Sequence, residues 1–272
     1  MADGRKNRQM REDMKGYIID LDGTVYTGKT AIDGAAEAIR LLRGHDVPFV
    51  FLSNRGNYSA RMCREKLAGM GVEVRDEELL LSSTVTARYL QRESPGSSFW
   101  ALGEQGLVDE LQLAGLQAAE RPEDAQWLVI TLHETVTYRD LNMAFRAVRA
   151  GARIIATNAD KSFPGDDGDA IDVAGMIGAI THSTGSEVEV VIGKPGRYMA
   201  EAALEALGLP PELCMIVGDS VESDITLGRN AGIRTALVLT GSARADRLAE
   251  LAPQPDEVHA SLLQVLQGQS KA

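Results

Sequence analysis

The sequence predicts an α/β protein with a doubly wound, Rossmann-like parallel sheet as its core and a second α/β domain inserted into that core. Short apolar runs alternate with stretches of helical periodicity along the chain, a pattern typical of parallel sheets. Acidic or polar residues directly follow the apolar runs near both ends of the chain but mostly not in the middle. The length of 272 residues allows two domains of ordinary size.

The first block carries the opening strand, helix and strand of the core. Tyr17–Asp20 is a short apolar run that ends in an acid, and Ala35–Leu42 repeats apolar residues at helical spacing. Pro48–Leu52 is a continuous apolar run suited to burial on both faces. Ser59 can cap a helix that continues to Met70.

The middle block predicts three strands and two helices, namely Ser98–Leu102, Trp127–Leu132 and Arg153–Ala156, with helices near Gly106–Ala114 and Tyr138–Arg149. The last block predicts a return to the core, with strands Glu189–Ile192, Cys214–Val217 and Thr235–Leu239 and a helix over Tyr198–Leu207. We therefore expect the core at 17–82 and 187–272, and an inserted cap at 83–186. Residues 1–16 are charged and predict a partly disordered lead-in.

Composition and charge restrict the partners. The net charge of −11 repels nucleic acid and anionic membrane surfaces on average, although a local site can still attract a small anion. No apolar run approaches the ~20 residues that span a bilayer, and the charged N-terminus lacks the apolar segment of a signal peptide. Cys63 and Cys214 lie in unrelated patterns, so we expect buried, reduced thiols and a cytoplasmic protein.

Two incompatible phosphate-binding motifs overlap near the N-terminus. Residues Gly23–Thr30 match the spacing of a nucleotide-binding P-loop, which would make the chain a kinase or NTPase. The overlapping run DLDGT instead offers Asp20 and Asp22 at the end of a strand. A P-loop needs a tight nest of backbone N–H groups, which the β-branched and aromatic residues 24–27 resist, and the helix pattern starts only after Asp33. The carboxylates are therefore favoured, and the P-loop is kept as a remote alternative.

Polar side chains follow four predicted strands, at the edge where open parallel sheets bind ligands. They are Asp20 and Asp22, Ser53 and Asn54, Lys194, and then Asp219, Ser220 and Asp224.

These residue types fit phosphoryl transfer through a covalent carboxyl-phosphate. A carboxylate can act as the nucleophile, and Mg²⁺ takes oxygen ligands from carboxylates, phosphate and water. A second acid can serve the leaving alcohol and the attacking water. Gly23 would allow a turn and offer an unobstructed N–H to a phosphate oxygen, while Ser53 and Lys194 would hold the remaining oxygens.

The order DLDGT, LSN, GKP and GDSVESD resembles the haloacid dehalogenase-like (HAD) phosphatase superfamily. A cap between the second and third motifs is similar to class II, and ATNAD followed by FP resembles the class IIA nitrophenyl-phosphatase and N-acetylglucosamine-operon subclass. Runs such as FLSNRGN, LGEQGLVDEL and DVAGMIGAI resemble the sugar-phosphate phosphatases of bacterial arabinose operons. The resemblance spans the chain after about residue 16.

The resemblance implies a role for each motif residue. Asp20 would be the nucleophile and Asp22 the general acid and then base. Ser53 and Lys194 would bind phosphate with the backbone near Gly23 and Asn54. The implied Mg²⁺ ligands are the Asp20 carboxylate, the Asp22 carbonyl and the Asp219 carboxylate. Asp224 would orient water or Lys194.

The cap motif departs from the family pattern, which puts substrate choice in question. Relatives commonly carry Asn-Asn where this chain has Asn54-Arg55, and T-N-P-D where it has T-N-A-D. The resemblance directs Asn158, Asp160 and Phe163 toward the substrate. The alternative is that Asn158 and Asp160 stabilise a turn and Phe163 packs in the cap core.

The predicted function is Mg²⁺-dependent hydrolysis of small phosphorylated metabolites, sugar phosphates first, through an aspartyl-phosphate. Phosphoglycolate, glycerol phosphate and pyridoxal phosphate stay open as substrates, and a phosphomutase stays open as a related activity. Asp22 argues against a dehalogenase, because a halide leaving group needs no proton. A non-catalytic binding module would not need the full set of acids. A homodimer through the cap edge is also expected.

Overall fold

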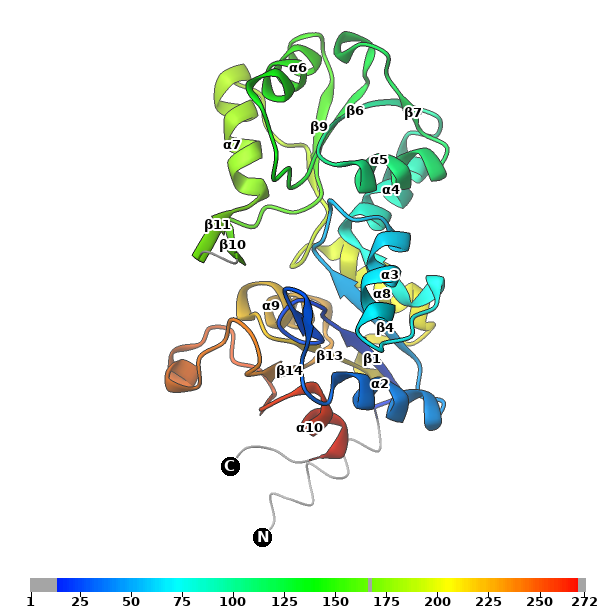
Figure 1. The fold of residues 1–272 in the computed structure, drawn as a ribbon, viewed down its shortest axis with the longest axis vertical. Coiled ribbons are helices and arrows are strands. Elements are labelled where there is room, and N and C mark those ends of the chain that lie inside the picture. Colours follow the sequence, from blue (N-terminus) through cyan, green and yellow to red (C-terminus); the bar gives the residue numbers. More distant parts are fainter. Residues whose placement is uncertain (1–13, 166–167, 269–272) are drawn as a thin grey trace. The chain divides into compact units, whose positions relative to one another are not determined.

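A computed structural model describes residues 14–165 and 168–268 and divides the chain into two compact units (Figure 1). The first unit comprises Met1–Ser53, Arg64–Leu80 and Lys194–Ala272, and the second comprises Asn54–Cys63 and Leu81–Gly193. The chain thus changes unit at 80/81 and 193/194, close to the expected boundaries at 83 and 186, and residues 54–63 group with the second unit. Of the predicted lead-in, residues 1–13 lie outside the described residues, and the first strand begins at Gly16.

The first unit contains a six-stranded sheet in the order β15-β14-β13-β1-β4-β5. Its strands are β1 (Gly16–Ile19), β4 (Phe49–Ser53), β5 (Leu79–Leu81), β13 (Cys214–Gly218), β14 (Arg234–Val238) and β15 (Glu257–His259). Its helices are α2 (Ala35–Gly44), α8 (Arg197–Leu207), α9 (Thr226–Ala231) and α10 (Leu262–Gln267), while α3 (Ala60–Gly69) begins in the second unit and ends in the first. Short helical turns lie at η1 (Asp76–Glu78), η3 (Pro211–Leu213), η4 (Val221–Ile225) and η5 (Ala245–Glu250).

The winding of this sheet reverses between β1 and β13. The chain passes from β1 through α2 to β4 on one side, and from β13 through α9 to β14 on the other. Right-handed crossovers in opposite directions place α2 and α9 on opposite faces. Strands β1, β4 and β13 are buried along their whole length, which explains their continuous apolar sequences. The carboxyl ends of β1 and β13 therefore form the switch point at which such sheets bind ligands.

The hairpin after β1 contradicts the P-loop alternative. Strands β2 (Tyr26–Thr27) and β3 (Thr30–Ala31) pair antiparallel around Gly28, whose φ is 57°. Backbone groups that a P-loop would direct at a phosphate are therefore used in strand pairing. Helix α2 starts only at Ala35, after Gly34 with φ of 82°. The segment is a turn between the first strand and the first helix, as favoured from the sequence.

The second unit has its own parallel sheet, in the order β12-β9-β8-β6-β7. Its strands are β6 (Ser98–Leu102), β7 (Gln117–Ala118), β8 (Trp127–Ile130), β9 (Arg153–Ala156) and β12 (Val190–Val191), and β10 (Ser162–Gly165) pairs with β11 (Gly168–Ile171). Its helices are α4 (Ser82–Glu93), α5 (Gln105–Leu113), α6 (Tyr138–Arg149) and α7 (Val173–Thr184), with a short turn at η2 (Pro122–Asp124). Apolar residues of β8, β9, α6 and α7 form one buried cluster. The predicted α/β core and the second α/β unit are both confirmed.

One predicted core strand belongs to the other sheet. Residues 189–192 were expected to form a core strand that carries Lys194 at its end. Instead, β12 pairs with β9, with Val190 opposite Ile155. A continuous apolar run gives no information on its pairing partner, which explains the error. Lys194 consequently comes from the loop before α8.

Both cysteines are buried, as expected, and burial together with nearby Glu212 raises the pKa of the Cys214 thiol to about 11. Over the described ranges, the helices are too short or too polar for any of them to cross a membrane.

Candidate active site

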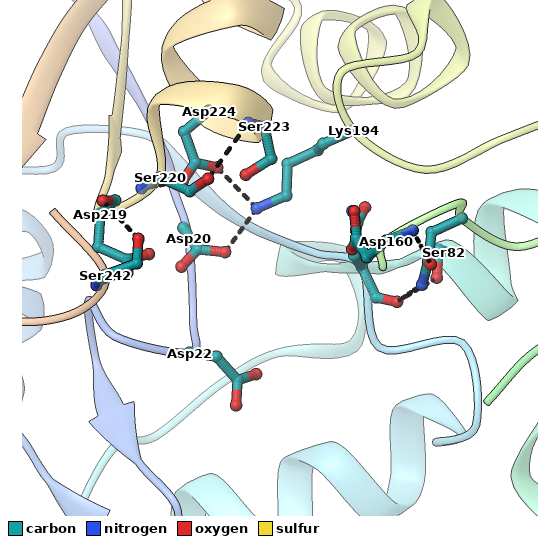
Figure 2. A network of polar contacts seen from close by, with 12 residues as sticks. Asp20, Asp22, Ser82, Asp160, Lys194, Asp219, Ser220, Ser223, Asp224 and Ser242 are labelled. Atoms are coloured by element: carbon teal, nitrogen blue, oxygen red, sulfur yellow. Dashed lines mark hydrogen bonds and ion pairs between the residues drawn. The ribbon is translucent and has the colours of Figure 1, made fainter. Parts of the chain in front are cut away.

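Four charged side chains of the first unit meet at the switch point. Asp20 follows β1 and Asp219 follows β13, and these strands pair in parallel with Ile19 opposite Val217. Lys194 Nζ lies 2.5 Å from Asp20 Oδ1 and 2.7 Å from Asp224 Oδ1 (Figure 2). The structure thus brings together Asp20, Lys194, Asp219 and Asp224, which are separated by up to 204 residues along the chain.

A turn of π-helix positions Asp224. The segment η4 follows Ser220, whose Oγ accepts from the Ser223 N–H at 3.3 Å, and the Ser220 N–H donates to Asp224 Oδ2 at 3.1 Å. A Cβ on Gly218 would overlap the Asp224 carboxyl group, so glycine is required where β13 ends. Asp224 is completely buried, and both of its carboxylate oxygens accept hydrogen bonds.

The charges of the site do not balance. Burial raises the pKa of Asp20 well above its ordinary value, against the attraction of Lys194 and together with repulsion from Asp224 and Asp219. Burial also raises the pKa of Asp219, again with repulsion from Asp224 and against the Ser242 N–H and Lys194. Burial alone would lower the pKa of Lys194, but Asp20 and Asp224 raise it, so the lysine is a permanent cation. Three carboxylates facing one ammonium leave two excess negative charges when all are ionised.

The donor set fits a divalent cation. Carboxylate oxygens of Asp20, Asp219 and Asp224 all lie within 4.8 Å of one another. Asp20 Oδ2 is buried and has no hydrogen-bond partner, which is costly for a carboxylate oxygen. Hard oxygen ligands and an excess charge of minus two suit Mg²⁺.

Two residues of the loop after β14 complete the site and were missed in the sequence. The Ser242 N–H donates to Asp219 Oδ2 at 2.5 Å, and the Ser242 hydroxyl donates to the Asp219 carbonyl at 3.0 Å. Thr240 Oγ1 donates to the Gly23 carbonyl at 2.5 Å. The sequence signal was available, because Thr240-Gly241-Ser242 directly follows a predicted core strand, as the other site residues do.

The turn that contains Gly23 is closed by hydrogen bonds. Gly23 has φ of 82°, and its N–H donates to the Tyr26 carbonyl at 2.7 Å. The expectation that this N–H is open to a phosphate oxygen was therefore wrong, because the tight turn itself uses it. Gly23 is nevertheless required, since a Cβ there would lie 2.5 Å from Asp219 Oδ2.

Asp22 stands apart from the charged cluster. Its Oδ2 accepts a hydrogen bond from the Tyr26 hydroxyl at 2.8 Å, and its carboxylate is directed away from Asp20 (Figure 2). Ser53 is the last residue of β4, buried beside β1, with Phe51 opposite Ile19. Both residues therefore lie at the carboxyl edge of the sheet, as predicted.

Within the second unit, three polar residues form a cluster around Asn54. Its Nδ2 donates to Asp160 Oδ2 at 2.8 Å, and its carbonyl accepts from Asn158 Nδ2 and Ser82 Oγ, each at 2.8 Å (Figure 2). Phe163 is half-buried and packs on the apolar cluster of this unit. These contacts match the alternative in which the three predicted specificity residues stabilise the cap, and a direct role toward substrate stays a prediction.

An acidic cluster at the switch point of a doubly wound sheet is the arrangement expected of a ligand-binding or catalytic site. Residues 17–117 match the family model described as haloacid dehalogenase-like hydrolase, and residues 191–265 match a second model described as HAD-hydrolase-like. The chain belongs to the haloacid dehalogenase-like hydrolase family.

Three proteins with named activities are similar to this chain over most of its length. The chain is 59% identical over 229 residues to the sugar-phosphatase AraL of Bacillus subtilis (strain 168), covering 84% of each chain. It is 32% identical to the 5′-nucleotidase YutF of the same strain, covering 91% of this chain and 96% of the relative. A p-nitrophenyl phosphatase from Archaeoglobus fulgidus superposes with a TM-score of 0.89 at 35% identity, covering 94% and 100%. The predicted enzyme class, a phosphatase, is confirmed.

Proposed function

We propose that this protein is a Mg²⁺-dependent phosphomonoesterase that hydrolyses small phosphorylated metabolites, sugar phosphates first, through an aspartyl-phosphate. The observation that carries the proposal is the buried, unpartnered Asp20 Oδ2 at the switch point, within reach of the carboxylates of Asp219 and Asp224. The sugar-phosphatase AraL, at 59% identity, supports the substrate class.

In the proposed reaction, Asp20 is the nucleophile. Asp20, Asp219 and the Asp22 carbonyl would hold Mg²⁺, which supplies positive charge that offsets the anionic phosphate. An Asp20 oxygen forms a bond to phosphorus as the bond to the leaving alkoxide oxygen breaks. Lys194 and Ser53 bind the non-bridging oxygens, and Lys194 offsets their charge. Asp224 holds the Lys194 ammonium in place through its 2.7 Å contact.

Asp22 moves the proton in both steps. In an in-line displacement the leaving oxygen lies on the side of phosphorus opposite the nucleophile. The Asp22 carboxylate is directed away from Asp20, as an acid that serves this oxygen requires (Figure 2). Asp22 first donates a proton to the leaving alkoxide. The resulting carboxylate then takes a proton from the water that attacks phosphorus, which releases inorganic phosphate and restores Asp20.

Replacing the nucleophile tests this proposal. Asp20→Asn should lower kcat by at least about a thousandfold, because the amide cannot form the acyl phosphate. The matched control is Lys29→Met, which removes the lysine of the P-loop pattern from an exposed hairpin and should leave kcat unchanged. Substantial activity in Asp20→Asn, with a folded chain shown by circular dichroism, would sink the mechanism.

Product analysis and a substrate panel decide among the remaining activities. The panel should compare kcat/KM for pentose, hexose and glycerol phosphates, phosphoglycolate, pyridoxal phosphate and a nucleoside monophosphate, since one relative is a 5′-nucleotidase. A phosphatase releases inorganic phosphate, whereas a phosphomutase returns an isomeric phosphate ester. The cytoplasmic location and a homodimer through the second unit also remain predictions.

A further inference from the structure

Tyr26 makes a specific contact with the proposed general acid. The Tyr26 ring is completely buried in the turn after β1, yet its hydroxyl donates to Asp22 Oδ2 at 2.8 Å. The turn fixes the backbone on both sides of this contact. The Tyr26 N–H donates to the Leu21 carbonyl at 3.1 Å, and the Tyr26 carbonyl accepts from the Gly23 N–H.

A cation lies over the face of the same ring. The Lys66 ammonium, from the part of α3 that belongs to the first unit, is 3.8 Å from the Tyr26 ring centroid. This arrangement is a cation–π interaction. A positive charge over the ring withdraws electron density from it, which makes the phenol O–H a stronger hydrogen-bond donor. Lys66 therefore contacts Tyr26, and Tyr26 in turn contacts Asp22.

We propose that Tyr26 is a positioning residue for proton transfer by Asp22, and that Lys66 strengthens its effect. This inference rests on the proposed function. With Oδ2 accepting the phenol O–H, Oδ1 is the oxygen that would carry the proton that Asp22 transfers. Tyr26 therefore selects which oxygen delivers the proton and fixes the plane of the carboxyl group.

The same hydrogen bond favours the transition state over the ground state. When the Oδ1 proton passes to the leaving alkoxide, negative charge develops on the Asp22 carboxylate. A hydrogen bond to a carboxylate is stronger than one to a neutral acid, so the Tyr26 contact strengthens as the proton leaves. An interaction that is stronger in the transition state accelerates the step. A leaving group that needs no proton gains nothing from it.

Tyr26→Phe tests the proposal, because it removes the hydroxyl and keeps the ring that packs and faces Lys66. For glycerol phosphate, whose alkoxide needs a proton, kcat/KM should fall roughly 10- to 100-fold, a part of the 10²–10⁴ that general acid catalysis contributes. For p-nitrophenyl phosphate, kcat/KM should stay within about twofold, since nitrophenolate leaves without a proton. The matched control is Tyr17→Phe, which removes a buried phenol from β1 and should change neither value.

Lys66→Met provides a second variant at a half-buried position. The loss of a cation–π contact predicts a roughly two- to fivefold fall for glycerol phosphate alone. Equal losses on both substrates in Tyr26→Phe and Lys66→Met would indicate a structural role and overturn the inference.

Asp22→Asn separates the two proposals. If Asp22→Asn shows the selective loss and Tyr26→Phe does not, only the role of Tyr26 is wrong. If Asp22→Asn shows no selective loss, the proposed acid is wrong and the role of Tyr26 falls with it.

Discussion

Asp20 has two differently used oxygens. Oδ1 accepts from Lys194, while Oδ2 is buried without a partner. The protein retains this arrangement although burial, together with repulsion from Asp224 and Asp219, disfavours the ionised form of Asp20. Such an arrangement destabilises the site without a cation and favours binding of one. Functional sites commonly lower the stability of a protein in this way.

The raised pKa values of Asp20 and Asp219 predict the pH dependence of stability. Between the ordinary and the raised pKa, the folded chain holds protons that the unfolded chain has released. Stability from these groups is therefore complete below the ordinary pKa and is lost as pH rises through the raised one. Protons and Mg²⁺ compete for the same oxygens, so Mg²⁺ should bind more weakly as pH falls.

Asp219→Asn tests this dependence. With a chelator present to remove Mg²⁺, the variant should be more stable than the wild type by about 0.5–2 kcal/mol at neutral pH, because it lacks one buried carboxylate. The difference should shrink toward pH 4. Mg²⁺ should raise the melting temperature of the wild type and not that of the variant. Scanning calorimetry measures both the stability difference and the shift in melting temperature. Asp33→Asn, at an exposed position, is the control. A destabilised variant at neutral pH would contradict the interpretation.

At the residue level, the sequence indicated the charged groups but not their local partners. Asp20, Asp219 and Asp224 could be predicted because residues after parallel strands converge at one edge, whereas Lys194 was predicted from a strand that belongs to the other sheet. The N–H of Gly23 was misjudged, since the hydrogen bond to Tyr26 depends on how tightly the turn closes. The contact between Tyr26 and Asp22 joins a fully buried aromatic residue to a polar one, which neither periodicity nor strand position reveals.

Among the elements of the site, the junction of β13 with η4 leaves no room for a side chain at Gly218. The π-helical turn brings the Asp224 carboxyl group against the Cα of Gly218. π-Helical turns are frequent at functional sites, and this one leads directly into α9. The position of Asp224, and through it that of Lys194, thus depends on a glycine with an ordinary backbone conformation.

Gly218→Ala should displace Asp224 and weaken its contact with Lys194. We expect a loss of about 1–3 kcal/mol, as for overpacking in a core, and at least a tenfold loss of kcat. Gly44→Ala, in α2 with open space around the new methyl group, should instead be neutral or gain roughly 0.5–1 kcal/mol. Urea denaturation and steady-state kinetics measure the two effects. A wild-type kcat in Gly218→Ala would show that Asp224 need not be held so closely.

Element types were easier to predict than their partners. The strands Ser98–Leu102 and Arg153–Ala156 and the helix Tyr138–Arg149 coincide with their predicted bounds. Strand β12 was assigned to the wrong sheet, because its two valines could pack equally well in either sheet. Helices α4 and α7 were not predicted, since their apolar residues are mixed with serine, threonine and glycine.

On the scale of the whole molecule, the proposed cation ligands all come from the first unit, while the second unit has a parallel sheet and an apolar cluster of its own. A ligand stabilises the structure that binds it. Since local stability varies along a chain, binding in one unit need not slow the opening of the other.

Mg²⁺ should therefore slow amide hydrogen exchange in β1 and β13 and leave β8 and β9 nearly unchanged. Exchange measured by mass spectrometry with and without Mg²⁺ tests this expectation, and Asp219→Asn should abolish the effect in β1 and β13. Equal protection of all four strands would show that the two units open as one cooperative structure.

The burial of Cys63 and Cys214 has a practical consequence. A thiol with a raised pKa and no access to solvent reacts slowly with alkylating dyes. Single cysteines placed at Lys29 in the β2–β3 hairpin and at Leu113 in α5, both exposed, can therefore carry fluorophores without first removing a native thiol. Energy transfer between such labels would test whether the separation of the two units changes during turnover.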